Sequence, residues 1–371
     1  MELRFNFLLV ALLLLSVSAD AGYHLRKDYT KTIKKQFNIN PNGRASIDNQ
    51  MGNIRIETWE QNAVRVSITI KVNARNEERA QTIMDRVDFS FDNTRDYVNV
   101  STEIEGNSWS WKKGGDKHET FQVNYLITAP KSLVFNLENR YGSITTPHLD
   151  GPLTVSNAYG DVRLGDVKTD LNLELNYGNG QGGSATRVRG ELHYFKYGMQ
   201  RAEEVSIENR YGTLRANEIG KLTTDSRYGH YELGNVSTLI YSGRYDRFDI
   251  DRVDRVTFDG QFSNLECRQV RDELNLNMEY GSARVDQLQR GFSAVNIAGN
   301  YADCQIIVED GASFQLDAEA EFAGVRYPRN MEVTREVEKG TSHHVKAYNG
   351  TPNARSVIRV RLDYGGLRLT E

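Results

Sequence analysis

A single pattern of apolar and polar residues recurs along the middle of the chain. Each repeat centres on an aromatic residue, usually followed by glycine, and most successive rings are 17 to 21 positions apart, with one spacing of 14 and a last one of 42. The rings are Tyr141, Tyr159, Tyr177, Tyr197, Tyr211, Tyr228, Tyr245, Phe262, Tyr280, Tyr301, Phe322 and Tyr364. Apolar residues alternate with polar ones before each ring, as at Val205 and Ile207, and after it, as at Phe248 and Ile250. Alternation with a period of two predicts strands that bury one face.

Before each ring the apolar residues lie an even number of positions away from it, and after the ring they lie an odd number away. The chain must therefore turn a corner at the ring to keep the same face buried. We expect the glycine after the ring to supply that corner, because glycine adopts backbone angles that cost other residues energy. An apolar residue eight positions after the ring, such as Ile219 or Val253, indicates a short third segment. One such unit cannot close a core, whereas stacked units can. The sequence therefore predicts an all-β protein, a single-stranded parallel β-helix of about twelve coils of 17 to 21 residues, right-handed by the general preference of parallel crossovers.

The chain divides into four predicted regions. Residues 1–21 resemble a secretory signal peptide, because Arg4 precedes a short apolar run and small residues suited to cleavage. Residues 22–130 lack the ring period but keep strands, with one helix expected over 77–85, and are predicted to cap the solenoid. The β-helix is assigned to 131–327, and an irregular polar insertion with closing strands to 328–371. No later stretch is apolar enough to span a membrane, so no transmembrane span is expected after signal cleavage.

Composition narrows the class of protein. Among 371 residues, 46 lysines and arginines face 50 acidic residues, a net charge of -4, which argues against a basic nucleic-acid binder. The two cysteines, Cys267 and Cys304, both fall on predicted inward positions two coils apart. That separation is roughly 9.6 Å along the axis, beyond the Cα separation of about 7 Å that a disulfide tolerates. Two buried free thiols are therefore predicted.

Several segments together resemble a known family. They are the early Gly-Asn-Ile-Arg-Ile-Glu-Thr-Trp run at 52–59, the strand at Val64, the helix after it, the Ala129-Pro130 strand end, and the coils of Tyr-Gly-x-apolar type. The chain is similar in these features to the bacterial adhesin-like family of exported β-helical proteins, the DUF4097 type. The resemblance implies a β-helical fold and an adhesive role, and it brings no catalytic residues to this sequence.

The aromatic column is the first candidate site. It could stack sugars on its rings, or it could be an internal stack at the corner in which each ring packs on the next. We favour packing, because Phe262 and Phe322 fill the same position without a hydroxyl. A second candidate is a strip formed by Arg210, Arg227 and Arg244, each directly before a ring in successive coils, with Lys196 in the same place before Tyr197. These cations either form a solvated face with ion pairs or contact an anionic polymer.

Other combinations of residues predict no catalytic, cofactor-binding or metal site. The cluster Asp246, Asp249, Asp251 and Asp254 could serve a polysaccharide lyase or hydrolase, but arginines are interleaved with it, which suits compensated surface charge. The glycine-rich run 178–183 lacks the Lys-Ser/Thr of a phosphate loop and is interpreted as a turn. His343 and His344 are adjacent on a strand and should point to opposite faces, so they should not share a metal.

Three functional interpretations follow from the sequence. The first is an exported, non-enzymatic cell-envelope protein, an adhesin or a scaffold that binds a cell-surface glycan or envelope polymer. The second is a carbohydrate-active enzyme on the same scaffold, and the third is a purely structural periplasmic protein. Without a recognisable outer-membrane anchor or sorting tail, the periplasm is favoured slightly over the cell surface. The sequence does not indicate an oligomeric state.

Overall fold

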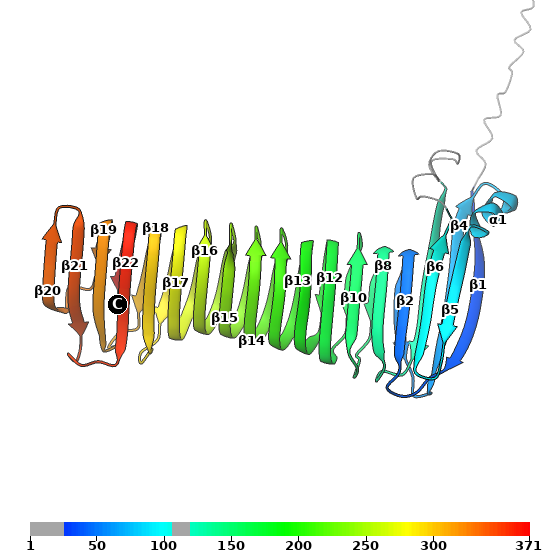
Figure 1. Cartoon of the computed structure of the whole chain (residues 1–371), viewed down its shortest axis with the longest axis horizontal. Helices are drawn as coiled ribbons and strands as arrows, with labels where there is room; N and C mark the ends of the chain where they lie inside the picture. Colours follow the sequence, from blue (N-terminus) through cyan, green and yellow to red (C-terminus); the bar gives the residue numbers. More distant parts are fainter. Residues whose placement is uncertain (1–25, 106–118) are drawn as a thin grey trace, which may run out of the picture.

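The structure, a computed structural model, describes residues 26–105 and 119–371. The predicted signal peptide lies outside these residues. The described chain forms one elongated parallel β-helix whose coils stack along the long axis, as Figure 1 shows. No helix in the described ranges is long and apolar enough to cross a membrane.

Each coil contributes one rung to each of two sheets that meet at the aromatic corner. Face A contains the segments before each ring, and face B contains the segments after it. Strands in consecutive coils pair in parallel and in register, so that Val205, Leu222, Leu239 and Val256 fall on one inward line of face A. These four side chains are buried, which confirms the predicted alternation. The residues eight positions after the rings, such as Ile219 and Val253, are also buried in the third segment.

The strands of the regular coils run in chain order along the axis. They are β8 (Val134–Tyr141), β9 (Ile144–Thr146), β10 (Leu153–Ala158), β11 (Val162–Leu164), β12 (Val167–Gly182), β13 (Ser184–Arg210), β14 (Thr213–Arg227), β15 (His230–Arg244), β16 (Arg247–Gln261), β17 (Asn264–Leu288), β18 (Ala294–Val308) and β19 (Phe314–Arg326). From β12 onward most of them contribute rungs to both faces.

The N-terminal end mixes parallel and antiparallel strands. Its elements are β1 (Lys27–Asn38), β2 (Arg44–Met51), β3 (Ile54–Thr58), β4 (Ala63–Ala74), α1 (Glu77–Met84), β5 (Val87–Asn93), β6 (Tyr97–Ile104) and β7 (Thr120–Ala129). On face A the parallel coils continue through β2 and β6 and end in the antiparallel strand β5. On face B they continue through β3 and β7 and end in the antiparallel strands β4 and β1.

The helix predicted over 77–85 is present as α1. The side chain of Asn76 caps it by accepting a hydrogen bond from the backbone N–H of Arg79, and Ala80, Ile83 and Met84 are buried. The early coil is also present, with Met51 paired to Tyr141 in the place of a ring.

The C-terminal end differs from a simple continuation of the stack. The chain forms β19, then the antiparallel hairpin of β20 (Glu332–Lys339) and β21 (Ser342–Asn349), and returns as β22 (Ser356–Thr370). Strand β22 lies between β18 and β19 and pairs in parallel with both (Figure 1). The predicted irregular insertion is therefore wrong in part, because much of 328–354 is a hairpin that extends face A beyond β19.

The two thiols behave as predicted. Cys267 and Cys304 are buried and free, and no disulfide joins them. Burial raises the pKa of the Cys304 thiol to about 12, so this sulfur stays protonated and unreactive at neutral pH.

Candidate binding surface

A ladder of stacked aromatic rings runs along the corner between the two faces. Neighbouring rings are nearly parallel, with interplanar angles of 1° to 15° and centroids 4.7 to 5.3 Å apart. In spatial order the ladder is Tyr141, Tyr159, Tyr177, Tyr194, Tyr211, Tyr228, Tyr245, Phe262, Tyr280, Tyr301, Tyr364 and Phe322. Tyr364 precedes Phe322 because β22 is inserted before β19.

The predicted packing of ring on ring is present, but its predicted internal position is wrong. Every ring of the ladder is 40% to 53% exposed, so the stack lies on the outside of the corner. The faces of the inner rings are covered by their neighbours. A sugar could therefore meet the ring edges and hydroxyls of the inner rungs but could not stack on their faces.

The outward position follows from the backbone at the corner. All rings after Tyr141 have a positive φ, between 51° and 61°, where the left-handed conformation turns the side chain away from the core. This conformation costs a residue other than glycine or asparagine about 1–2 kcal/mol. Stacking offsets part of that cost, because an aromatic pair contributes about 0.5–1.5 kcal/mol beyond the burial of area.

The glycine after the ring has a different role from the predicted one. At most corners its φ is not positive, so the ring residue and not the glycine makes the left-handed turn. The glycine is needed because a Cβ there would collide with the coil below, for example 2.0 Å from the carbonyl oxygen of Gly142 at Gly160 and 2.1 Å from that of Gly160 at Gly178.

One predicted member of the column is wrong. Tyr197 is buried in the core on the line of Leu214, and Tyr194 takes its place in the ladder. Desolvation raises the pKa of the Tyr197 phenol. Lys196 consequently lies two positions after a ring, on face B, and does not belong to the arginine strip. The signal was in the spacing, since 177 to 197 to 211 is uneven, whereas 177 to 194 to 211 gives two equal steps of 17.

The glycine-rich run 178–183 explains how Tyr197 fits. It is not a turn, as predicted, because 178–182 belongs to strand β12. A Cβ on Gly180 would lie 2.9 Å from the ring of Phe195, and one on Gly182 would lie 2.2 Å from the hydroxyl of Tyr197. These glycines leave room for the two large rings of the next coil.

The arginine strip is present beside the ladder. Arg210, Arg227 and Arg244 pair in register in successive coils of face A. Arg210 forms an ion pair with Glu208. Within the described residues, neither Arg227 nor Arg244 forms an ion pair, and both are exposed. Arg227 and Arg244 therefore place two positive charges without an ion-pair partner along one side of the ladder.

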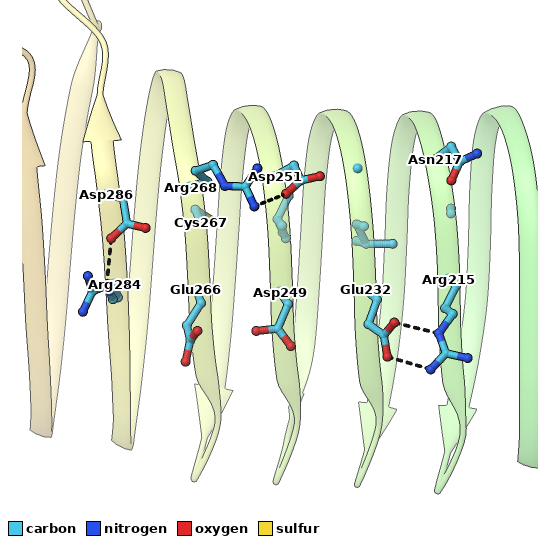
Figure 2. Close-up of a pocket in the computed structure, with 14 residues that line it drawn as sticks. Arg215, Asn217, Glu232, Asp249, Asp251, Glu266, Cys267, Arg268, Arg284 and Asp286 are labelled. Carbon is cyan, nitrogen blue, oxygen red and sulfur yellow. Dashed lines mark hydrogen bonds and ion pairs between the residues drawn. The ribbon is translucent and has the colours of Figure 1, made fainter.

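Face B carries a row of shallow hollows on the other side of the ladder. Three of them, of about 310, 470 and 540 Å³, follow one another along the axis. Arg215 lines the first and the central hollow, and Glu266 and Arg284 line the central and the last one. Figure 2 shows that each arginine of the central hollow is paired with a carboxylate. Arg215 pairs with Glu232, Arg268 with Asp251, and Arg284 with Asp286.

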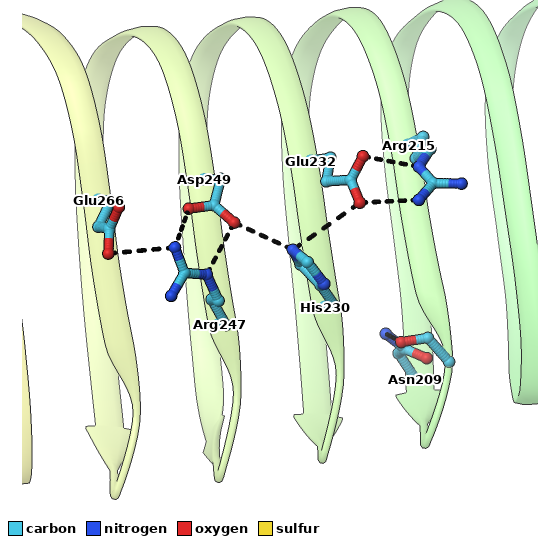
Figure 3. A network of polar contacts seen from close by, with 8 residues as sticks. Asn209, Arg215, His230, Glu232, Arg247, Asp249 and Glu266 are labelled. Atoms are coloured by element: carbon cyan, nitrogen blue, oxygen red, sulfur yellow. Dashed lines mark hydrogen bonds and ion pairs between the residues drawn. The ribbon is translucent and has the colours of Figure 1, made fainter.

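These pairs belong to a larger network across several coils (Figure 3). His230 Nε2 lies 3.0 Å from Asp249 and 3.9 Å from Glu232, and Arg247 contacts both Asp249 and Glu266. The hydrogen bond from Arg247 lowers the pKa of the Asp249 carboxyl, as the bond from Arg215 does for Glu232.

The predicted acidic cluster does not form one site. Asp249 and Asp251 lie in the paired network, and Asp254 pairs with Arg271 at 3.2 Å. Asp246 points the other way, into the corner, where it is 2% exposed. Its carboxylate accepts hydrogen bonds from Tyr241 Oη, Ser226 Oγ and the backbone N–H of Gly229. Desolvation nevertheless raises the pKa of Asp246 above its ordinary value.

Asp246 also reveals a packing rule that the sequence analysis missed. The residue two before a ring and the residue one after it share the space inside the corner. In two corners the polar residue comes before the ring and glycine after it, as Asn209 with Gly212 and Ser226 with Gly229. In the next two corners the order is reversed, as Gly243 with Asp246 and Gly260 with Ser263. A Cβ on Gly243 would lie 2.7 Å from the Asp246 carboxylate. Each of these corners holds one polar side chain, contributed from either side of the ring.

Comparisons with known proteins give little beyond the fold. No family model and no curated protein matches the sequence. Among solved structures, the chain is similar to a "putative adhesin" of Bacteroides fragilis, with 8% identity, a TM-score of 0.30, and coverage of 91% of this chain and 97% of that one. It is similar to a "putative cell adhesion protein" of Clostridium sporogenes, with 8% identity, a TM-score of 0.19, and coverage of 92% and 99%.

A third similar structure is a "putative lipid binding protein" of Parabacteroides distasonis, with 8% identity, a TM-score of 0.27, and coverage of 92% and 97%. The first two names agree with the family resemblance of the sequence. Likeness at this level of identity and TM-score carries no argument about what this chain binds.

Proposed function

We propose that this protein is an exported, adhesin-like scaffold that binds an extended anionic polymer of the cell envelope along its aromatic corner, without catalysing a reaction. The exposed ladder carries the proposal. Asparagine would adopt the left-handed corner at lower cost, yet the described coils from Tyr159 to Phe322 all place a ring there, half in water. A long exposed apolar ridge is typical of an interaction surface.

The shape of the ridge indicates the shape of the ligand. The ladder is one ring wide and follows the axis, with rungs about 4.8 Å apart. It presents ring edges, and at most positions a tyrosine hydroxyl that can donate and accept hydrogen bonds. A chain-like ligand that lies along the axis could repeat one set of contacts at many rungs, and its affinity would grow with length.

The arginine strip indicates the charge of the ligand. Arg227 and Arg244 adjoin the ladder and have no carboxylate within ion-pair distance among the described residues. Face B offers less, because its charges already neutralise one another. An anionic glycan or a lipopolysaccharide would place its charges over the strip and its sugar edges over the rings.

A binding assay with polygalacturonate and with purified lipopolysaccharide tests this proposal. The variant Arg210→Gln, Arg227→Gln, Arg244→Gln should bind at least about tenfold more weakly, and binding of the parent should fall as salt rises, because exposed charges are screened beyond about 8–10 Å. The matched control replaces three arginines that lie away from the ladder, Arg201, Arg252 and Arg268, with Gln and should bind like the parent. Equal binding by both variants would refute the role of the strip.

The ladder needs its own variant. Replacing Tyr211, Tyr228 and Tyr245 with Asn keeps residues that tolerate a positive φ, so the β-sheet circular dichroism should be unchanged while binding falls. Release of reducing or unsaturated ends from the polymer would instead support the enzymatic alternative. Export, and the periplasm in preference to the surface, are tested by cell fractionation with protease treatment of intact cells.

A further inference from the structure

Two histidines at the C-terminal end have opposite surroundings. They are adjacent on β21, and as predicted their side chains point to opposite faces. His344 Nε2 lies 2.9 Å from Asp317, whose carboxylate also pairs with Lys346 at 3.0 Å. The nearby Glu319 pairs with Arg361 at 3.6 Å. Asp317 and Glu319 on this face therefore each have a basic partner of fixed charge.

The other face of the hairpin lacks such partners. His343 Nε2 lies 3.0 Å from Glu336 Oε1 and 3.8 Å from Glu338 Oε1. Glu338 is directly across the hairpin from His343, and Glu336 is one diagonal step away. Among the described residues, no lysine or arginine forms an ion pair with either glutamate. A single imidazole cannot neutralise two carboxylates, whether or not it is protonated.

The geometry points to a metal site, and we propose that His343, Glu336 and Glu338 bind one divalent transition-metal ion. One imidazole nitrogen and two carboxylate oxygens all lie within 4.8 Å of one another. Ligands about 2.0–2.2 Å from a zinc ion lie roughly 3.3–3.6 Å apart in a tetrahedron, so small side-chain rotations would close the site. The donor set of one nitrogen and two oxygens suits Zn²⁺ and its neighbours, with water completing the shell.

Two further observations fit a site of this kind. Tyr327 Oη lies 3.1 Å from Glu336 Oε1 and donates a hydrogen bond that orients this carboxylate, as outer partners commonly do for metal ligands. The side chain of His343 is only 18% exposed and lies on the same face as the buried Val345. The imidazole is therefore held in place, while the open side faces water and admits an ion.

The consequence of binding would be local. Strand β20 is the last rung of face A, it is exposed over its whole length apart from its pairing with β21, and it contributes two of the three ligands. An ion that joins both strands would hold this edge strand in place. Ligands that bind only the folded state stabilise it by mass action, so β20 should gain protection when the metal binds.

Titration of the whole protein with ZnCl₂ by calorimetry tests the proposal. We expect one site of micromolar affinity, weakened at least tenfold in His343→Ala and in Glu338→Gln, and unchanged in the matched control His344→Ala. Hydrogen exchange should slow at β20 on addition of Zn²⁺ in the parent and in His344→Ala only. The absence of binding below millimolar Zn²⁺, or equal loss in His343→Ala and His344→Ala, would overturn the site. Glu338→Gln, an exposed change, keeps the test valid if His343→Ala fails to fold.

Discussion

Single residues in this fold differ in importance according to the side of the strand that they occupy. Phe248 is fully buried and packs face to face on Tyr231 at 4.1 Å, with Tyr241 and Phe258 at its edges. Its neighbour Arg247 points outward and pairs with Asp249 and Glu266 in the surface network. One step along the chain therefore separates a core ring from a surface cation.

We expect Phe248→Ala to cost about 3–5 kcal/mol of unfolding free energy, as a large truncation in a packed core. Arg247→Ala should cost under about 1 kcal/mol, because exposed ion pairs contribute little. Denaturant midpoints of the two variants measure the difference. Similar shifts would show that the inward register of this coil is misassigned.

The stability of variants at a ladder position should depend more on the backbone angle there than on the contacts of the side chain. Tyr228 has a φ of 57°. Tyr228→Asn should lose its stacking but accept the left-handed conformation, whereas Tyr228→Val places a β-branched side chain where it is strained by a further ~1–2 kcal/mol. Thermal unfolding should therefore rank the parent above Asn and Asn above Val. A valine variant as stable as the asparagine variant would contradict the strain at the corner.

Asp246 predicts how stability depends on pH. Its pKa is raised in the folded state by desolvation, so the folded protein binds this proton more tightly than the unfolded chain does. The resulting stabilisation is present below the ordinary aspartate pKa and is lost as pH rises through the raised value. Asp246→Asn cannot titrate. The stability of this variant relative to the parent should therefore improve from acid to neutral pH.

The control for this prediction is Asp249, whose pKa is lowered by Arg247. Its contribution has the opposite sign, present above the ordinary aspartate pKa and lost on acidification. Asp249→Asn should consequently approach the parent in stability as pH falls. Denaturant unfolding across pH measures both, and parallel pH profiles for the two variants would refute the assignment.

At the scale of the element, the corner is a shared space with a simple exclusion rule. Gly243→Asn alone should be destabilising, because its side chain meets the Asp246 carboxylate. Asp246→Gly alone removes the carboxylate that accepts hydrogen bonds from Tyr241 and Ser226. The double variant restores the arrangement of Asn209 with Gly212, so it should be more stable than the sum of the single changes implies. Additive effects would show that the two positions do not compete.

Sequence reasoning succeeded for elements whose identity depends on period alone. Alternation located the inward residues of most coils, and a polar run of helix-forming residues located α1. It failed where the local pattern is ambiguous, since Tyr197-Gly198 has the same form as a true corner. It could not predict that the rings face outward, because apolar periodicity does not report the sign of φ. The meeting of His343 with Glu336 was also inaccessible, because it depends on the register of a hairpin between variable segments.

On the scale of the molecule, the two ends of the solenoid are closed in different ways. The N-terminal end uses antiparallel strands and α1, which packs on β4 and β1. The C-terminal end uses the last strand of the chain, β22, as a rung inserted between β18 and β19. No local sequence pattern predicts this insertion, and the only indication of it is the long spacing between the rings at 322 and 364.

The inserted rung leads to a prediction about the whole molecule. The stability of a repeat protein is approximately the sum of the stability of each coil and the energy of its contacts with neighbouring coils. Removing residues 356–371 should therefore leave the coils up to β18 folded. Strand β19 would lose its parallel partner, and β18 would expose a free edge. Unpaired parallel edges recruit other chains. We therefore expect the truncated protein to keep most of its β-sheet circular dichroism, to lose hydrogen-exchange protection from β19 to β21, and to associate in light scattering. A truncated chain that stays monomeric, with β19 still protected, would mean that β19 can settle directly on β18 and that the inserted strand is dispensable for closure.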